Sequence, residues 1–185
     1  MKTLLFPGQG SQNIGMGLEF YQKFDIVKKL FSLADDILGF RLSKIILEGP
    51  DNELKLTQNT QPAIMTVSYS IFKVLKDEFG LTLNQYKYFA GHSLGEYSAL
   101  VCAESLDFKD ALFLLRERGT AMQNAVPAGK GAMLAVLGIG IDEIKKFISK
   151  IKSAEVCEIA NDNAPGQLII SGGINAINEL KEILI

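Results

Sequence analysis

The sequence predicts an α/β fold in two parts, a parallel sheet with helices in residues 1–126 and a smaller βαββα unit in residues 127–185. Three observations predict it. Short apolar runs that suit buried strands alternate with longer stretches of helical periodicity. Glycine-rich turns follow two of these runs, after Phe6 and around Ser93. After Pro127 the order changes to strand, helix, strand, strand, helix.

The first part opens with a strand at Thr3–Phe6, followed by the turn PGQGSQ and a mostly helical stretch from 16 to 40. The next long helix is expected to begin at Thr60-Gln61-Pro62 and to end at Gly80. Threonine can cap a helix, and proline is tolerated in the first helical turn. This helix is apolar on more than one face, so we expect it to be buried.

A second strand, 86–91, leads into Ser93 and a helix that runs to Cys102. Asp107 is expected to cap the following helix. Strand and helix alternate throughout, which favours a parallel sheet with helices on both faces. The buried stripe of the last helix is predicted from its spacing to comprise Phe108, Ala111, Leu112, Leu115, Gly119 and Met122.

The second part has a strand at 131–139, a helix at 142–151, two strands around an Asn/Pro/Gly turn within 154–172, and a helix at 175–185. One more strand would complete a ferredoxin-like split βαβ unit. The sequence therefore predicts an incomplete ferredoxin-like subdomain, typical of a fragment or truncated product. A three-stranded version packed on a partner is the alternative.

Composition narrows the classes of function. The 185 residues carry a net charge of −2, with 19 basic and 21 acidic residues and no long basic cluster, so no nucleic-acid partner is expected. No apolar run approaches the ~18 residues of a membrane span, and the N-terminus is too short for a signal peptide. Two cysteines without metal spacing fit a reducing compartment. We expect a cytoplasmic protein with no membrane partner, no metal and no tightly bound cofactor.

Ser93 stands between Gly91 and Gly95, at the junction of an expected strand and an expected helix. This pattern is typical of the serine elbow of α/β-hydrolase-like folds, in which flanking glycines avoid collisions in a strained turn. The helix would point its N-terminus at the serine oxygen, and the backbone N–H of Leu94 would lie where an oxyanion forms. The pattern favours a nucleophilic serine over a plain turn.

His92 is the only histidine of the chain. Successive side chains on a strand point to opposite sides, so its imidazole should face away from the Ser93 hydroxyl. We expect a packed, hydrogen-bonded histidine rather than a base. A serine nucleophile then lacks its usual base, unless a carboxylate or lysine substitutes or the base lies in sequence beyond this chain.

Five motifs occur in order along the chain. The motifs are FPGQGSQ at 6–12, TQPA at 60–63, GHSLGEYSAL at 91–100, RG at 118–119 with AMQNAVP following, and NDNAPGQLIISG at 161–172. Together they closely resemble the malonyl-CoA:acyl carrier protein transacylase family, and more distantly the acyltransferase domains of polyketide and fatty-acid synthases. The resemblance covers the whole chain and corresponds to the N-terminal portion of the family.

This resemblance implies a two-step acyl transfer in fatty acid biosynthesis. Ser93 would attack the thioester of malonyl-CoA, hold the malonyl group as an ester, and pass it to the phosphopantetheine thiol of acyl carrier protein. The resemblance places the backbone N–H of Gln9 beside that of Leu94 in the oxyanion hole. Gly8 and Gly10 would let that backbone approach closely.

The resemblance also assigns the substrate-binding residues. Arg118 matches the arginine that grips the malonyl carboxylate, where a planar fork can donate two hydrogen bonds. Helical spacing alone places Arg116 and Arg118 on the two shoulders of the buried stripe and does not choose between them. Gln61 matches a polar residue of the pocket, and Asn163 would reach the site from the small subdomain.

The chain departs from the family in one respect. Family members continue past Ile185, and their catalytic histidine comes from that returning segment, so the general base is expected beyond this sequence. The expected function is an [acyl-carrier-protein] S-malonyltransferase. The alternatives are a non-catalytic truncated fragment and a serine hydrolase or thioesterase, and a hydrolase of neutral acyl chains would not place Arg118 in its pocket.

Overall fold

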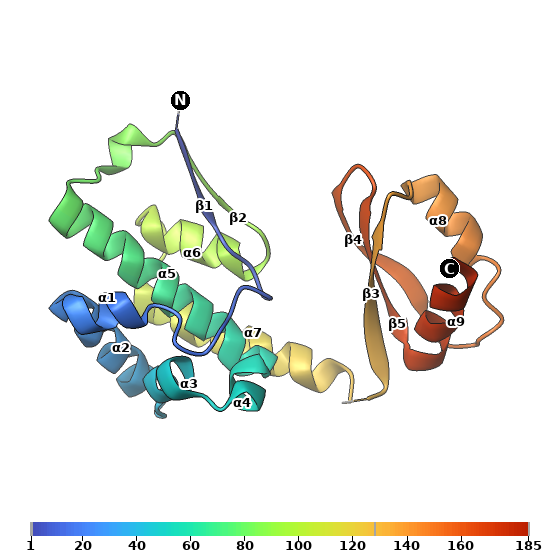
Figure 1. Cartoon of the computed structure of the whole chain (residues 1–185), viewed down its shortest axis with the longest axis horizontal. Coiled ribbons are helices and arrows are strands. Elements are labelled where there is room, and N and C mark those ends of the chain that lie inside the picture. Colours follow the sequence, from blue (N-terminus) through green and yellow to red (C-terminus); the bar gives the residue numbers. More distant parts are fainter. Residues whose placement is uncertain (1, 128, 185) are drawn as a thin grey trace. The chain divides into compact units, whose positions relative to one another are not determined.

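The computed structural model describes residues 2–127 and 129–184 of the chain; Met1, Ala128 and Ile185, the last residue of the expected C-terminal helix, lie outside it. The chain divides into two compact units, Met1–Asn124 (unit 1) and Ala125–Ile185 (unit 2). Figure 1 labels their helices and strands, and each unit is described by itself. Both mix helix with strand, as the sequence predicts.

The elements of unit 1 follow the order expected for alternating strands and helices. The strands β1 and β2 are separated by a long helical region, and β2 is followed directly by a helix. The elements are β1 (Thr3–Phe6), α1 (Leu18–Lys23), α2 (Asp25–Leu38), α3 (Leu42–Glu48), α4 (Asp51–Lys55), α5 (Thr57–Phe79), the short 3₁₀ helix η1 (Leu83–Gln85), β2 (Tyr88–Gly91), α6 (Leu94–Cys102) and α7 (Phe108–Ala125), whose last residue crosses into unit 2.

The sheet of unit 1 consists of β1 and β2, which pair in parallel from Thr3 opposite Tyr88 to Phe6 opposite Gly91. One face of this sheet packs on α5 and α6 through a small apolar cluster that includes Phe72 and Cys102. On the other face Leu5 is 76% exposed. In the described residues, the expectation of helices on both faces is therefore met on one face only.

The main core of unit 1 is built around α5. Figure 1 shows the other helices of unit 1 arranged around α5. Its buried side chains pack with those of α2, α3, α4, α6 and α7. This burial explains why the α5 sequence is apolar on more than one face. The core includes Val27, Phe31, Leu42, Ile46, Leu54, Ile64, Met65, Leu94, Leu112 and Leu115.

The start of α5 differs from the sequence expectation. The helix begins at Thr57, so Pro62 lies inside it rather than in its first turn. Thr60 does not cap the helix, because it lies inside α5, whose N-cap is Leu56. Its buried hydroxyl donates to the carbonyl oxygen of Leu54 at 2.5 Å. The preceding helix α4 packs against this end of α5, and that tertiary contact extends the helix beyond the local signal.

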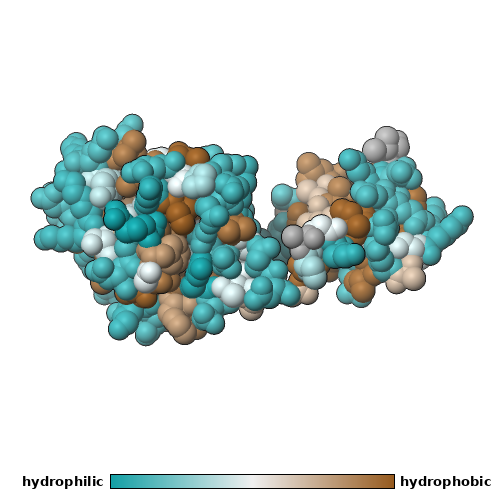
Figure 2. All heavy atoms as spheres, turned by 90° about the horizontal axis from the view of Figure 1, so that it is seen from below, coloured by the Kyte–Doolittle hydropathy of each residue, from teal (hydrophilic) through white to brown (hydrophobic). Residues whose placement is uncertain are grey.

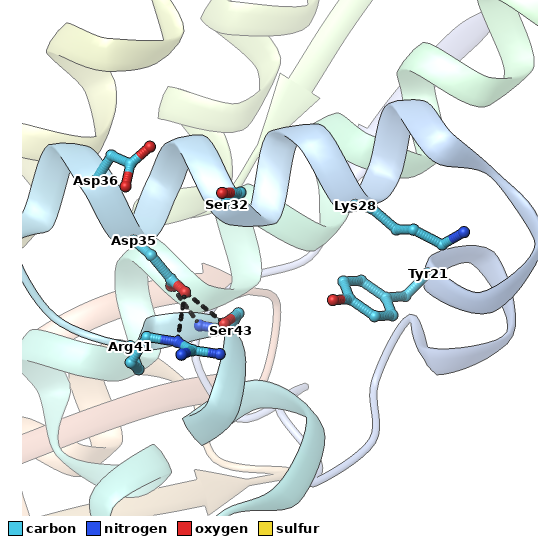
Figure 3. Close-up of a pocket in the computed structure, with 7 residues that line it drawn as sticks. All are labelled: Tyr21, Lys28, Ser32, Asp35, Asp36, Arg41 and Ser43. Atoms are coloured by element: carbon cyan, nitrogen blue, oxygen red, sulfur yellow. Dashed lines mark hydrogen bonds and ion pairs between the residues drawn. The ribbon is translucent and has the colours of Figure 1, made fainter.

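Asp35 of α2 joins α2 to the beginning of α3 (Figure 3). Its carboxylate accepts hydrogen bonds from the backbone N–H of Ser43 at 2.7 Å and from the Ser43 hydroxyl, and it forms an ion pair with Arg41 at 3.2 Å. A first-turn N–H of α3 is thereby satisfied by another helix. These three residues form part of the lining of a polar hollow of about 310 Å³.

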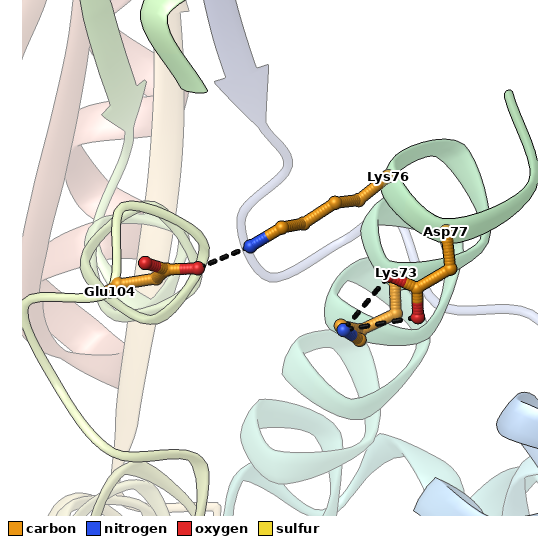
Figure 4. Close-up of polar contacts among 4 residues, drawn as sticks. All are labelled: Lys73, Lys76, Asp77 and Glu104. Carbon is orange, nitrogen blue, oxygen red and sulfur yellow. Dashed lines mark hydrogen bonds and ion pairs between the residues drawn. The ribbon is translucent and has the colours of Figure 1, made fainter. Parts of the chain in front are cut away.

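A surface ion pair connects the ends of α5 and α6 (Figure 4). Lys76 of α5 donates to the carboxylate of Glu104, which follows α6 and has a left-handed backbone at φ 60°. This hydrogen bond raises the pKa of Lys76 and lowers that of Glu104. Lys73 pairs with Asp77 along α5 at 3.1 Å. Exposed pairs of this kind stabilise a fold only slightly.

Unit 2 has the predicted order of strand, helix, strand, strand, helix: β3 (Gly131–Leu137), α8 (Ile141–Ile148), β4 (Cys157–Ala164), β5 (Gln167–Gly173) and α9 (Ile174–Leu184). Its sheet is antiparallel with β5 between β3 and β4. Helices α8 and α9 cover one face of the sheet. Their core residues pack on those of the strands: Val136, Ile144, Leu168, Ile170, Ile177 and Leu180.

Both units expose apolar side chains. On the face seen in Figure 2, brown apolar patches interrupt the teal hydrophilic surface of each unit.

Met122, expected in the buried stripe of α7, is 49% exposed. The other five residues of that stripe are buried as predicted. Among the described helices, none combines the length and the apolar composition that crossing a membrane requires.

Candidate active site

Ser93 occupies a sharp turn between β2, which ends at Gly91, and α6, which begins at Leu94. Its backbone has φ 56° and ψ −116°, a conformation that residues other than glycine rarely adopt. Two backbone hydrogen bonds hold the turn, from Gly95 N–H to the His92 carbonyl at 2.9 Å and from Glu96 N–H to the Ser93 carbonyl at 3.1 Å. Strain of this kind is typical of functional sites.

The two glycines of the turn are required by close backbone contacts. A Cβ at Gly91 would overlap the backbone of Gly95, the second residue of the following helix. A Cβ at Gly95 would lie 2.6 Å from the carbonyl oxygen of Phe6. Helix α6 therefore starts directly against the end of β1, and any larger residue at either position would push the turn away from the sheet.

The glycine-rich loop after β1 lies beside the same turn. A Cβ at Gly8 would come within 3.0 Å of the His92 carbonyl oxygen, so the loop backbone approaches the residue that precedes Ser93. Within the loop, Gly10 N–H donates to the Gln12 side chain at 2.7 Å and the Ser11 hydroxyl donates to the Gly8 carbonyl at 2.9 Å. The exposed Gln9 side chain donates to Thr57 at 3.4 Å.

Leu94 supplies a backbone donor at this place. It is the first residue of α6, and the N–H groups of a first helical turn have no acceptor within the helix. Its side chain is fully buried, which fixes the backbone at the elbow. Leu94 thus follows Ser93 directly, and the loop that carries Gln9 approaches the same turn at Gly8.

Arg118 of α7 reaches the elbow. Its Nη2 donates to the Ser93 hydroxyl oxygen at 3.0 Å, and its Nη1 donates to Gln61 Oε1 at 2.7 Å. The guanidinium carbon lies 6.0 Å from the centre of the Tyr97 ring. Within the described residues no acidic side chain pairs with Arg118, so its charge is available to an anionic group.

Gln61 is buried beneath this arginine on α5, with no exposed side-chain surface. Its amide has a partner at each end, because Oε1 accepts from Arg118 and Nε2 donates to the Met122 sulfur at 3.3 Å. A buried amide held on both sides presents its oxygen in one fixed direction. Gln61 therefore orients the guanidinium toward Ser93.

Gly119 lets α7 approach α5 closely enough for these contacts. A Cβ at this position would lie 2.5 Å from Gln58 Cα and 2.7 Å from the Thr57 carbonyl oxygen. Backbone atoms cannot move aside as a flexible side chain can. The sequence pair Arg118-Gly119 thus joins the side chain that contacts Ser93 to the helix crossing that positions it.

Sequence reasoning missed the contact of Tyr97 with the arginine. Tyr97 lies four residues after Ser93 on α6, and helical spacing places such residues on one face, so that signal was present. It also missed that Met122, assigned to the core, contacts Gln61 instead. Only the crossing of α5 and α7 brings Met122 to Gln61.

The structure corrects the expectation for His92. Its side chain is exposed, whereas a packed, hydrogen-bonded histidine was predicted. Because β2 is at the surface of the described chain at this point, the imidazole has no core to enter. Within the described residues of unit 1, the hydrogen-bond partner of the Ser93 hydroxyl is the donor Arg118, and no base accepts its proton.

Unit 1 thus brings together Ser93, Arg118 and Gln61. Asn163 belongs to unit 2, where it lies exposed on β4 at a register shift between Asp162 and Ala164. In the described residues, no group of three or more His, Cys, Asp or Glu side chains is arranged to hold a metal ion. The gathered residues offer a hydroxyl, a cation and backbone donors, which suit chemistry on a carbonyl group beside an anion.

Comparison with known proteins gives matches over nearly the whole chain. A family model described as the acyl transferase domain matches residues 3–184. The malonyl CoA-acyl carrier protein transacylase of Bacillus subtilis (strain 168) is 47% identical over 182 residues, which cover 98% of this chain and 56% of that protein. Its counterpart in Escherichia coli (strain K12) is 42% identical over 95% of this chain and 56% of its own length.

Solved structures match as well. The acyl-carrier-protein S-malonyltransferase of Bartonella henselae has a TM-score of 0.91 at 43% identity and is matched over 99% of this chain and 59% of that one. A malonyl-transacylase in complex with a type II PKS acyl-carrier protein has a TM-score of 0.88 at 39% identity, over 97% of this chain and 57% of that one. The chain spans about half the length of the curated relatives it matches, 56% in both.

Proposed function

The chain belongs to the acyl transferase domain family, and from that membership we propose that it forms part of an [acyl-carrier-protein] S-malonyltransferase of fatty acid biosynthesis. The substrates would be malonyl-CoA and acyl carrier protein. The names of the relatives support this proposal, and so does the complex of one structural neighbour with an acyl-carrier protein.

One observation carries the proposal: Arg118 donates to Ser93 Oγ at 3.0 Å and has no acidic partner among the described residues. A half-buried cation beside a nucleophile selects an acyl group that itself carries a carboxylate. The planar guanidinium can bind that carboxylate with two parallel hydrogen bonds. A malonyl group has its carboxylate close to its thioester carbonyl, so one ligand can meet both residues.

In the first half-reaction, Ser93 Oγ would attack the thioester carbonyl of malonyl-CoA. The carbonyl oxygen becomes an oxyanion, for which we assign the backbone N–H groups of Gln9 and Leu94 as donors. The C–S bond then breaks, and coenzyme A leaves as the thiol when a proton reaches its sulfur. The malonyl group remains on Ser93 as an ester.

In the second half-reaction, the phosphopantetheine thiol of acyl carrier protein attacks that ester, and Ser93 recovers its proton. Both steps need a group that accepts a proton and returns it. His92, the only histidine of the 185 residues, is exposed at the elbow and is not assigned this role. We propose that the base belongs to sequence outside this chain.

The finer features of the fold and site belong to the same proposal. We assign residues 1–126 to the N-terminal part of a large acyltransferase domain with an α/β-hydrolase-like serine elbow. Residues 127–185 would form an incomplete ferredoxin-like subdomain, since β5 lies between β3 and β4 as in a split βαβ unit. Asn163 would serve the pocket from this subdomain. A cytoplasmic location fits the soluble substrates.

Intact-protein mass spectrometry after brief exposure to malonyl-CoA tests the proposal, with Ser93→Ala as the matched control. We expect a malonyl adduct in the natural full-length protein that is absent from the variant. An adduct on the 185-residue chain would indicate that this portion alone assembles nucleophile and oxyanion hole. Equal adducts in both proteins, or none in the full-length protein, would contradict the assignment of Ser93.

A matched exposure to acetyl-CoA distinguishes the alternative of a hydrolase or thioesterase for neutral acyl groups. We expect much slower labelling by acetyl-CoA, because Arg118 has no carboxylate to bind. Labelling at equal rates, followed by release of the acyl group to water, would favour the hydrolase. A folded chain without any adduct would favour a non-catalytic fragment.

A further inference from the structure

Pro62 leaves one carbonyl group of α5 without its helical partner. In an α-helix, the N–H of each residue donates to the carbonyl four residues before it, so residue 62 would donate to Gln58. Proline has no N–H, and its ring also crowds that carbonyl. Pro62 is buried inside α5, not at its first turn. The carbonyl of Gln58 therefore needs another donor.

Arg116 of α7 is that donor. Its Nη1 donates to the Gln58 carbonyl at 3.0 Å, and the same nitrogen donates to the side-chain oxygen of Asn59. The guanidinium also lies over the ring of Phe40, 4.7 Å from its centre. Burial lowers the pKa of Arg116, which is consistent with a guanidinium enclosed by these partners. Without this donor the part-buried Gln58 carbonyl would lack a hydrogen bond, so the contact stabilises the packing of α7 on α5.

Both arginines contact α5 close to the place where Gly119 of α7 lies against it. Arg116 binds α5 at Gln58 and Asn59, and Arg118 binds α5 three residues further on, at Gln61. Both side chains come from the same two turns of α7, so a rotation or shift of this helix would move them together. The Arg116 contact therefore fixes where the Arg118 guanidinium stands relative to Ser93.

We infer that Arg116 is a positioning residue: through the carbonyl that Pro62 leaves free, it locks α7 on α5 and so sets the Arg118 guanidinium at Ser93. The inference rests on the proposed function in one respect, namely that Arg118 binds the substrate carboxylate. It assigns the proline of the TQPA motif a task of its own, which is to expose an acceptor for a side chain of another helix.

Steady-state kinetics of the natural full-length protein with malonyl-CoA and acetyl-CoA test the inference. Arg116→Gln is expected to raise KM for malonyl-CoA by about tenfold or more while kcat falls less, since displacing a binding group by about 1 Å can cost up to about a hundredfold. The acetyl-CoA parameters should change little, so selectivity for malonyl falls. Arg116→Lys should recover part of the loss. Lys109→Gln, an exposed charge on the same helix, is the matched control.

A merely structural role of Arg116 would give a different result. Loss of folded protein lowers kcat equally for both substrates and leaves KM and the malonyl-to-acetyl ratio unchanged. That outcome would overturn the inference, provided that the wild-type protein transfers malonyl. If the wild-type protein does not use malonyl-CoA, the proposed function fails instead. The contact between Arg116 and the Gln58 carbonyl is then still tested by urea unfolding.

Urea unfolding of a double-mutant cycle between Pro62→Ala and Arg116→Gln tests the contact without any activity. Alanine restores an N–H that can donate to the Gln58 carbonyl, so Arg116→Gln should be clearly less destabilising in the Pro62→Ala background than in the wild type. The KM effect of Arg116→Gln should shrink in the same background. Identical effects in both backgrounds would refute the role of the carbonyl that Pro62 frees.

Discussion

Arg118 Nη2 lies 3.0 Å from Ser93 Oγ and donates a hydrogen bond to it. A cation thus contacts the serine hydroxyl directly. Nη1 of the same guanidinium donates to Gln61, so Nη2 is directed at the serine. On the proposed function, a substrate carboxylate that binds this fork would compete with the serine oxygen for Nη2 and would release the hydroxyl for attack.

Arg118→Ala should lower kcat/KM for malonyl-CoA by between about tenfold and a hundredfold, because hydrogen bonds to charged groups contribute about 1.5–3 kcal/mol. The value of kcat/KM for acetyl-CoA should fall far less, so the selectivity for malonyl-CoA over acetyl-CoA should decrease. For Arg118→Lys, kcat/KM for malonyl-CoA should lie between the values of the wild type and Arg118→Ala, since an ammonium keeps the charge without the bidentate geometry. Initial rates with the two thioesters measure the ratio, and an unchanged ratio would contradict the assignment.

Gln61→Glu should raise KM for malonyl-CoA. A carboxylate at this buried position would pair permanently with Arg118 and reduce its attraction for the substrate carboxylate. The effect on acetyl-CoA should be small. Gln22→Glu, which adds the same charge at an exposed site on α1, is the control for net charge. A lower KM in Gln61→Glu would mean that Gln61 does not act through Arg118.

Gly119→Ala should destabilise unit 1 by about 1–3 kcal/mol, the usual cost of forcing an extra carbon into a packed contact. The added Cβ would meet Gln58 Cα at 2.5 Å, and a backbone atom cannot turn away. Urea unfolding of the variant measures the loss. Lys109→Ala on the exposed face of α7 serves as the comparison, and equal stability of the two variants would refute the close crossing.

Glu155 should make the start of α9 sensitive to acid. Desolvation raises the pKa of its carboxyl, but hydrogen bonds from the backbone N–H groups of Ala176 and Asn175 outweigh it, and the pKa falls below its usual 4.5. A lowered pKa in the folded state means stabilisation that is complete above 4.5 and is lost as the pH falls through the folded value.

Amide hydrogen exchange of Asn175 and Ala176, measured at neutral pH and below pH 4.5, checks this prediction. Protection relative to the rest of α9 should decrease in acid. Glu155→Gln should lower protection already at neutral pH and remove most of the acid dependence. Acid dependence that persists in Glu155→Gln would assign it to another group.

Cys102 should resist alkylation in the folded protein. Its side chain is fully buried, and burial raises the pKa of the thiol, so little of the reactive thiolate forms. Cys157 is half-buried and should react first. Iodoacetamide labelling of a Cys157→Ser variant, with and without urea, isolates Cys102. Rapid labelling in buffer alone would contradict the packing of α6 on the sheet.

Much of the local structure follows from the sequence because its signals are local. β1 begins and ends as predicted, α6 ends at Cys102, and the N–H of Lys109 donates to the Asp107 carboxylate at 2.8 Å, as expected of a helix cap. The start of α5 could not be predicted in the same way. There, contact with α4 overrides the local signals of Thr60 and Pro62.

The sequence by itself determined the two-part order of elements, the elbow glycines around Ser93 and the motifs that resemble an acyltransferase. These depend on spacing and on backbone conformations that few residues adopt. Helical spacing could not choose between Arg116 and Arg118, and it placed Met122 in the core. The tertiary structure distinguishes the contacts of the two arginines and leaves Met122 half exposed, because only the crossing of α7 over α5 brings Gln58 to Arg116, and Gln61 to Arg118 and Met122.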